Sequence, residues 1–317
     1  MPIFEIHLQA YFKSVTMNSK YYIAVITAFS IWGFFSVVLK SLDDFTAFEI
    51  LSYRTLGSVV IMLFVTLVLR PKALKSNLNL FKTLGKIDKR RIIIVNILSG
   101  LFLALNWYIF IYVMNNVSVS ATSLAYLICP ILTMVLAYLI LKEKLLKLQW
   151  VAVILSLIGC LLLSIGNMTD LFYSMIIALT YALYLVLQRK NQELDRFIVL
   201  TCQVFFAVIF LLPFIVTYDA PNEKTPFFYG MLALIAVVFT IIPMFLNIYA
   251  LRGLNSSVVG VFIYLNPLIN FMLAIFYFNE NISVLEAICY VLIVISIVIF
   301  NFAAIKNRIN RRRAAHI

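Results

Sequence analysis

The chain has 317 residues, of which 64% are hydrophobic and only 12% are charged. A soluble domain is nearer half apolar and a quarter charged, so this composition excludes an ordinary soluble domain. The formal net charge of +12 is of the kind that nucleic-acid-binding proteins carry. We nevertheless expect no nucleic-acid partner, because the charges lie in short segments that flank apolar runs.

Ten apolar runs of about 20 residues fill nearly the whole chain, and an α-helix needs such a run to cross a hydrocarbon core of about 30 Å. A backbone in lipid has to satisfy its hydrogen bonds internally, so these runs predict helices. Because the connections are short, we expect one all-α polytopic membrane protein with ten transmembrane helices. The expected spans are 21–39, 45–69, 92–113, 117–141, 148–165, 171–188, 197–217, 227–251, 257–278 and 282–305.

The distribution of basic residues predicts how these spans are oriented. Successive connections lie on alternate sides of the membrane. Of the 25 lysines and arginines, only Lys40, Lys224 and Arg54 lie outside the set of segments that includes both termini. Basic loops stay in the cytoplasm, so this bias predicts that both termini are cytoplasmic. The largest basic cluster runs from Arg70 to Arg91, and we interpret it as a topology determinant with affinity for anionic lipid head groups.

The second half of the chain is a weak copy of the first. When Pro130 is placed on Pro267, Glu143 falls on Glu280. Each half then holds five spans, which is an odd number, so the second half crosses the membrane in the opposite direction. Inverted repeats are typical of secondary transporters, whose substrate site lies near the midplane between the halves. Further pairs in the same register are Tyr112 with Tyr249 and Ser120 with Ser257.

The repeat also sets the expected boundaries along the chain. Residues 1–16 are mixed in polarity and lack a strong periodicity, and Met17 precedes the first span. We therefore expect Met17 to be the native start and residues 1–16 to be an extension. We expect the first five-helix repeat over residues 17–166, the second over 167–305, and a basic cytoplasmic tail over 306–317.

Arg54 is the sharpest functional signal in the sequence. Counted from Phe45, it lies about nine residues into the second span, which is about 14 Å deep and close to the midplane. An arginine there costs at least about 3 kcal/mol on insertion scales, so it needs a carboxylate, carbonyls, water or an anionic ligand group. Glu49 is displaced by about 140° around the helix, so we expect a partner elsewhere. Three interpretations stay open: a positive charge beside the substrate path, a buried structural pair, and an arginine that caps backbone carbonyls.

Glu49 lies about one turn into the same span. An ionisable residue inside a membrane span is a candidate for a functional role, and we assign Glu49 as a candidate for coupling transport to a proton or ion. The alternative that stays open is an interfacial anion near Lys40.

Prolines inside the expected spans predict hinges. A mid-helix proline removes a backbone hydrogen bond, and in transporters such breaks line the cavity or act as hinges. Pro130 and Pro267 occupy matching places in the two halves, and Pro243 aligns with Asn106. Single proline kinks are common in membrane helices, so the matched pair is what favours a hinge.

Polar and aromatic side chains within the spans are candidates to line a substrate path. An aromatic cavity suits flat or amphipathic organic solutes and cations. Hydrogen bonding between helices and ordinary packing remain as alternatives for each residue. Besides Arg54, the candidates are Trp32, Asn106, Trp107, Tyr126, Tyr184, Tyr264 and Asn266.

Motifs for other chemistries are missing from the sequence. A Walker A loop and an HExxH motif are both absent, so we expect neither direct use of ATP nor a zinc peptidase. The only histidines, His7 and His316, are terminal. We therefore expect no enzyme, no metal and no cofactor. Glu143 and Glu280 each end a span beside a short turn, and we expect them to cap helices or pair loops.

These features together resemble the RarD-like branch of the EamA family, in the drug/metabolite transporter superfamily. The resemblance covers residues 18–305 and implies a ten-helix inner-membrane transporter built from two inverted repeats. One departure is Cys129, which stands where the family often has asparagine before the proline. The matching stretches are Ile31-Trp32-Gly33, Glu49-Ile50-Leu51 with Arg54, Asn106-Trp107, Asn115-Asn116, Tyr126 with Pro130, Glu143, Gln149-Trp150-Val151-Ala152-Val153-Ile154-Leu155, Tyr264 with Pro267, and Glu280.

The sequence therefore predicts a secondary transporter of small organic solutes in a bacterial plasma membrane, working by alternating access. Its expected partners are the solute, membrane lipid and a coupling proton or ion. Efflux is expected from the family resemblance alone. An integral-membrane enzyme and a non-transporting assembly or sensor protein stay open as alternatives. An enzyme would need convergent His, Asp or Cys side chains near one interface, and the sequence does not indicate such a group.

Overall fold

The computed structural model describes residues 19–42, 44–117, 119–164, 168–190, 194–218, 224–277 and 284–314. The regular secondary structure within these ranges is helical throughout. The expected extension, the start at Met17 and Glu280 lie outside the described residues. The helices are residues 19–33, α2 (Phe35–Lys40), α3 (Ala47–Phe64), η1 (Val65–Leu69), α4 (Pro71–Thr83), α5 (Lys86–Asn116), α6 (Val119–Leu141), α7 (Lys147–Leu163), α8 (Met168–Lys190), α9 (Arg196–Thr217), α10 (Pro226–Leu234), η2 (Ile235–Ile241), α11 (Ile242–Ala250), α12 (Ser256–Phe262), α13 (Leu265–Phe276) and α14 (Val284–Ala314).

Eight helical segments in the described chain are long and apolar enough to cross a membrane. Two further apolar helices are shorter, namely α7 and the segment Ala287–Ala303 within α14. All of them coincide with runs that the sequence predicts, and an all-α polytopic membrane protein is confirmed. The inverted arrangement of two repeats and the cytoplasmic position of both termini stay predictions.

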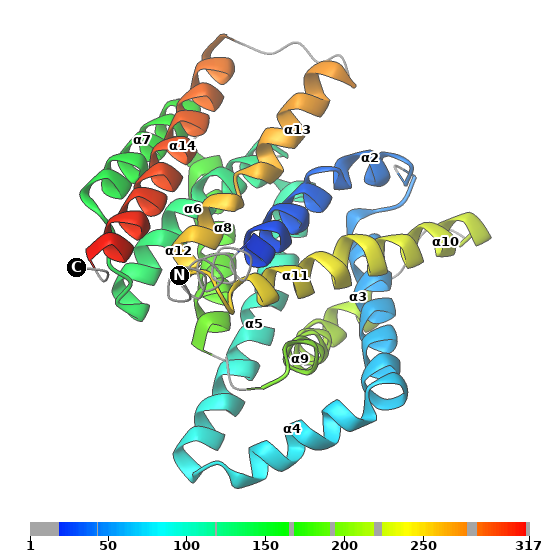
Figure 1. The fold of residues 1–317 in the computed structure, drawn as a ribbon. Coiled ribbons are helices and arrows are strands. Elements are labelled where there is room, and N and C mark those ends of the chain that lie inside the picture. Colours follow the sequence, from blue (N-terminus) through cyan, green and yellow to red (C-terminus); the bar gives the residue numbers. More distant parts are fainter. Residues whose placement is uncertain are drawn as a thin grey trace, which may run out of the picture.

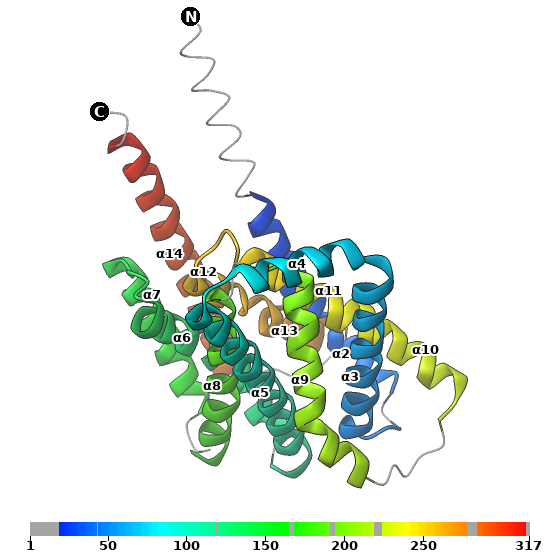
Figure 2. The ribbon, with the colours of Figure 1, turned by 90° about the horizontal axis from the view of Figure 1, so that it is seen from below.

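The helices form one bundle, with α4 lying across one end (Figures 1 and 2). α6 packs along α8, and α5 packs against both α8 and α9. α7 and α14 lie side by side at one edge, where Ser156 donates a buried hydrogen bond of 2.7 Å to Ser296. The other faces of these two helices carry large exposed apolar side chains such as Ile154 and Val298, so we expect them to face lipid.

The basic segment Arg70–Arg91 contains a helix that the analysis of spans does not predict. α4 begins with Pro71 at its N-terminus and crosses one end of the bundle from α3 to α5 (Figures 1 and 2). Arg70 donates two hydrogen bonds of 3.1 and 3.0 Å to Asp195, and Asp195 caps α9 by accepting from the backbone N–H of Phe197. We call this end the inner end and the opposite end, where α3 begins, the outer end.

α5 and α9 approach closely at Gly100. A Cβ atom at this position would lie 2.5 Å from the Cβ of Phe206 and 2.9 Å from the backbone oxygen of Gln203, both on α9. Helices in a membrane associate through close packing of this kind, because lipid tails are as apolar as the side chains. Gly100 therefore sets how near these two helices can lie.

Gly100→Ala is expected to destabilise the protein by about 1–3 kcal/mol, because the added methyl group overpacks the contact with α9. Gly230→Ala in α10 is the matched control, since nothing lies within 4 Å of its added Cβ and alanine favours the helix. Thermal unfolding of both variants in detergent measures the difference. Equal melting temperatures for the two variants would contradict the close packing of α5 on α9.

Candidate solute-binding site

Arg54 lies on α3 within the membrane span Ala47–Leu69. Its guanidinium carbon is 5.4 Å from the ring centroid of Trp107 on α5 and 5.7 Å from that of Phe35 on α2. Aromatic faces attract a cation, but they leave its N–H groups without ordinary acceptors. The Nε atom is buried and has no hydrogen-bond partner among the described residues. Arg54 is therefore a charged donor held between two aromatic rings.

No described carboxylate forms an ion pair with Arg54. Glu49 binds Lys224 instead, as expected from its position on a different face of α3. The alternative of a structural ion pair for Arg54 therefore has no support in the described part of the chain. The other carboxylates that bind elsewhere are Asp88 with Arg91, Asp195 with Arg70, and Glu143 with the backbone of Ser256 and Ser257.

Among the candidate tyrosines, Tyr126 on α6 is the one that lies within electrostatic range of the Arg54 guanidinium. Tyr184 on α8 stacks on Tyr181 with ring centroids 5.9 Å apart. Tyr184 and Tyr264 are each only 1% exposed and belong to the main hydrophobic core. The structure thus groups Arg54, Trp107 and Tyr126, whereas Tyr184 and Tyr264 are packed in the core.

Pro243 alters the helix geometry of the eighth span where that span packs on Phe35. It has no N–H, so it cannot donate to the carbonyl of Phe239 four residues earlier. The π-helical segment η2 forms directly before it, and the indole N–H of Trp32 donates to the Phe239 carbonyl over 2.9 Å. The Phe239 ring packs on Phe35, with centroids 5.3 Å apart. Trp32, a candidate to line the path, therefore connects the first span to η2.

The two repeat-related prolines have different surroundings. α6 continues through Pro130 without a break. The ninth span is interrupted between α12 and α13, at Ile263 and Tyr264, just before Pro267. Because Pro267 cannot donate to the Ile263 carbonyl, the backbone N–H of Asn266 donates to it over 3.1 Å. Of these two prolines, Pro267 follows an interruption of its helix and Pro130 does not, and the hinge role of both stays a prediction.

The two candidate asparagines are used in contacts between or within helices. Asn106 donates a hydrogen bond of 2.9 Å to the carbonyl of Ile177 on α8. Asn266 accepts one of 2.7 Å from Asn270, whose side-chain oxygen accepts from Ser36 at 2.8 Å. These bonds match the alternative of polar links between helices. Neither residue is brought together with Arg54 by any of these contacts.

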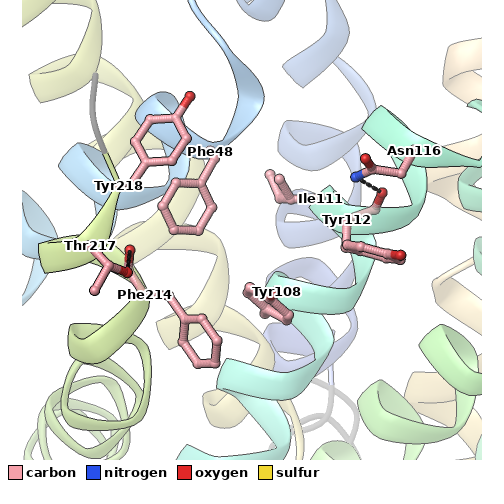
Figure 3. A pocket seen from close by; sticks show the side chains of 8 residues that line it. All are labelled: Phe48, Tyr108, Ile111, Tyr112, Asn116, Phe214, Thr217 and Tyr218. Carbon is pink, nitrogen blue, oxygen red and sulfur yellow. Dashed lines mark hydrogen bonds between the residues drawn. The ribbon is translucent and has the colours of Figure 1, made fainter. Parts of the chain in front are cut away.

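A cavity of about 300 Å³ lies at the outer end, between α3, α5 and α9 (Figure 3). Trp107, whose ring lies near Arg54, does not line this cavity but packs against the apolar cluster that includes Phe48 and Ile111, two of its lining residues. The sequence pattern alone does not predict these lining residues or Phe35 as part of the site. Ile111 and Tyr112 follow Tyr108 by three and four residues, a spacing that places all three on one helix face, and that pattern could have found them. The lining residues are Phe48, Tyr108, Ile111, Tyr112, Asn116, Phe214, Thr217 and Tyr218.

Glu49 closes the outer end next to this cavity. One carboxylate oxygen accepts from Lys224 at 2.5 Å, and the other accepts from the backbone N–H of Thr46 at 2.8 Å. The hydroxyl of Thr46 bonds in turn to that of Tyr218, at 2.7 Å. The Nζ atom of Lys224 lies 5.5 to 5.9 Å from three ring centroids, those of Phe45, Tyr53 and Phe228. Glu49 thus pairs with Lys224 rather than Lys40, and its coupling role stays a prediction.

Glu143 connects the two halves at the inner end. Its carboxylate accepts from the backbone N–H groups of Ser256 and Ser257 at 2.9 and 3.0 Å, and from the Ser257 hydroxyl at 2.6 Å. These N–H groups begin α12, where a helix has donors without internal partners. Glu143 therefore has a capping role in the structure.

Comparison with known proteins decides the family. The model of the EamA-like transporter family matches the chain twice, over residues 19–165 and 168–302. The chain belongs to the EamA-like transporter family. It is therefore a membrane transporter and a multi-pass protein of the bacterial inner membrane.

Relatives in the family are similar to this chain over most of their length. An uncharacterized transporter of Vibrio cholerae is 30% identical over 301 residues, which cover 91% of this chain and 94% of the relative. The uncharacterized transporter YojE of Bacillus subtilis is 27% identical, with coverage of 88% and 92%. Protein RarD of Escherichia coli is 25% identical, with coverage of 88% and 93%. The resemblance to the RarD-like branch is thus confirmed.

One solved crystal structure shares the fold. It aligns with a TM-score of 0.69 and 15% sequence identity, over 91% of this chain and 99% of that one. At this identity the likeness shows the fold alone.

Glu49→Gln is expected to destabilise this EamA transporter by about 3–5 kcal/mol, because it removes the negative charge from a buried pair with Lys224. The double variant Glu49→Gln/Lys224→Met should recover most of that loss. The control is Asp88→Asn, since the Asp88–Arg91 pair is nearly half exposed and should contribute at most about 1 kcal/mol. Thermal unfolding in detergent measures all three, and similar losses for Glu49→Gln and Asp88→Asn would refute the buried pair.

Proposed function

We propose that this EamA-family protein is a secondary transporter that moves small organic solutes across the inner membrane, in the direction of efflux, by alternating access. The observation that carries the proposal is Arg54, a buried charge in the bundle with no ion-pair partner among the described residues. Ionisable groups placed in this way mark substrate pathways. Trp107 and Tyr126 are the other residues that we assign to the path.

Alternating access requires the two halves to separate at one end of the bundle at a time. The two family matches, over 19–165 and 168–302, support a division of the chain into two repeats. Each end carries a contact between the halves: Glu49 with Lys224 at the outer end, and Glu143 with the start of α12 at the inner end. We propose that these contacts open in turn, with the interrupted ninth span before Pro267 as the hinge.

Glu49 remains our candidate for coupling. The outer contact joins two ionisable groups, so binding of a proton to Glu49 would weaken its attraction for Lys224 and favour opening at that end. Efflux as the direction rests on the family resemblance.

Arg54→Gln is expected to lower the transport rate at least about tenfold, because it removes the charged donor from the path. A melting-temperature screen of metabolites and drugs first finds a solute that stabilises the purified protein. Proteoliposomes loaded with that solute then give the rates of the wild type, Arg54→Gln and a control, Arg91→Gln. Arg91 lies in the exposed basic segment, so its variant should keep the wild-type rate. A folded Arg54→Gln protein with the wild-type rate would remove Arg54 from the path.

The charge distribution predicts that the segment around Lys86 and the tail over 306–317 lie together in the cytoplasm, opposite Lys40. Single cysteines at these places, in a variant without the four native cysteines, can be tested with a membrane-impermeant maleimide on intact cells. We expect Lys40→Cys to be labelled, and Lys86→Cys and the tail to be protected until the cells are opened. Labelling of the tail but not of Lys86→Cys would contradict the inverted arrangement.

A further inference from the structure

We propose that the solute is an organic anion whose acidic group binds the Arg54 guanidinium while its apolar part lies against Trp107. This inference rests on the proposed transport function and gives the substrate class of the same site. It follows from the hydrogen bonds that Arg54 lacks, from the rings beside it, and from the charges around it.

The hydrogen-bonding capacity of Arg54 points to an acidic ligand. A guanidinium has five N–H donors in a planar fork, which fits a carboxylate or phosphate with two parallel hydrogen bonds. The structure assigns no acceptor to this fork within the described residues, and its Nε is buried. A buried donor without an acceptor raises the free energy of the protein. A ligand with two acceptor oxygens would remove this cost by forming hydrogen bonds that the protein alone does not form.

The charges nearby select against a cation. Among the described carboxylates, Glu49 is the one on the same helix, and it accepts from Lys224 and Thr46. The local charge at Arg54 is therefore positive, and a second cation in this low-dielectric region would be repelled. A neutral solute gains hydrogen bonds but not charge attraction. An anion gains both, because hydrogen bonds between ionised groups are about twice as strong as neutral ones.

The surrounding rings select for an apolar body. Trp107 and Phe35 contact the guanidinium from α5 and α2, and Phe239 extends this aromatic surface. On the side of the outer end, the cluster that contains Trp107 reaches the 300 Å³ cavity of Figure 3. A cavity of this size lies at the lower end of the range for small-molecule sites. The acidic group would therefore bind at Arg54, and the apolar body would lie on the aromatic surface formed by Trp107, Phe35 and Phe239.

Matched probes test this proposal with the purified full-length protein in a neutral detergent without anionic lipid. The set comprises two carboxylates, benzoate and 2-naphthoate, with their neutral amides and the corresponding aminomethyl cations. Isothermal titration gives the dissociation constants, and melting temperatures give a second measure of binding. In the wild type we expect at least one carboxylate to bind at least about tenfold more tightly than its amide, and the cations to bind most weakly.

Three variants test whether the preference for carboxylates depends on Arg54. Arg54→Gln should weaken carboxylate binding at least about tenfold and leave amide binding unchanged. Arg54→Lys should lie between, since lysine keeps the charge but loses the planar fork. Arg91→Gln, the control for the basic segment, should change neither. If Arg54→Gln does not fold, the wild-type probe series and Arg54→Lys still decide.

Several results would overturn the proposal: amides or cations that bind as tightly as carboxylates, no carboxylate that binds, or a preference lost in Arg91→Gln but kept in Arg54→Gln. Transport is measured separately, in proteoliposomes with the same probes. Carboxylate binding at Arg54 without movement across the membrane would support the anion site and contradict the transport function. Arg54-independent transport of the amides or cations would support transport and contradict the anion site.

Discussion

The unpaired charge of Arg54 is the constraint on which the arrangement of the site depends. An arginine at mid-span costs at least about 3 kcal/mol on insertion scales. In the described residues this cost is not offset by an ion pair. Trp107 and Phe35 instead bring aromatic faces to the guanidinium from two other helices. Because such rings attract the charge without accepting its hydrogen bonds, the donors of Arg54 stay available to a third group.

Helix irregularities place the rings that hold Arg54. Pro243 leaves the carbonyl of Phe239 without its helical donor, and the indole of Trp32 supplies one. That bond fixes the first span against η2, and Phe239 then packs on Phe35 beside Arg54. Because Pro243 in the eighth span has no N–H, the Phe239 carbonyl is free to bind the indole of Trp32, which comes from the first span. Trp32 and Pro243 matter to the site through this geometry, without any contact of their own with Arg54 being needed.

Much of this fold follows from local sequence, because hydropathy over about 20 residues is a local property. The positions of the spans, the depth of Arg54 and the failure of Glu49 to reach it all come from counting residues along helices. The partner of Glu49 cannot be found by such counting. Lys224 precedes α10, far along the chain, and it contacts Glu49 because the bundle packs the two segments together. Asn106 illustrates the same limit. From the sequence, its side chain could hydrogen-bond to a solute or to a neighbouring helix. The packing of α5 on α8 determines that it donates to the carbonyl of Ile177.

The contacts between the halves at the two ends differ in chemistry, which bears on the proposed alternating access. Glu143 accepts from backbone N–H groups and a hydroxyl, all of which water can satisfy when the contact opens. Glu49 binds a lysine that lies among three aromatic rings, so opening there separates two charges from a largely apolar surrounding. Protonation of either carboxylate would weaken its hydrogen bonds, but at Glu49 it would also remove the negative partner of an ion pair. An anion at Arg54 would also neutralise the site between the ends, so the halves would rearrange around a group of no net charge. The empty protein, whose Arg54 still carries an uncompensated charge, would then have the larger energetic cost of rearrangement within the membrane.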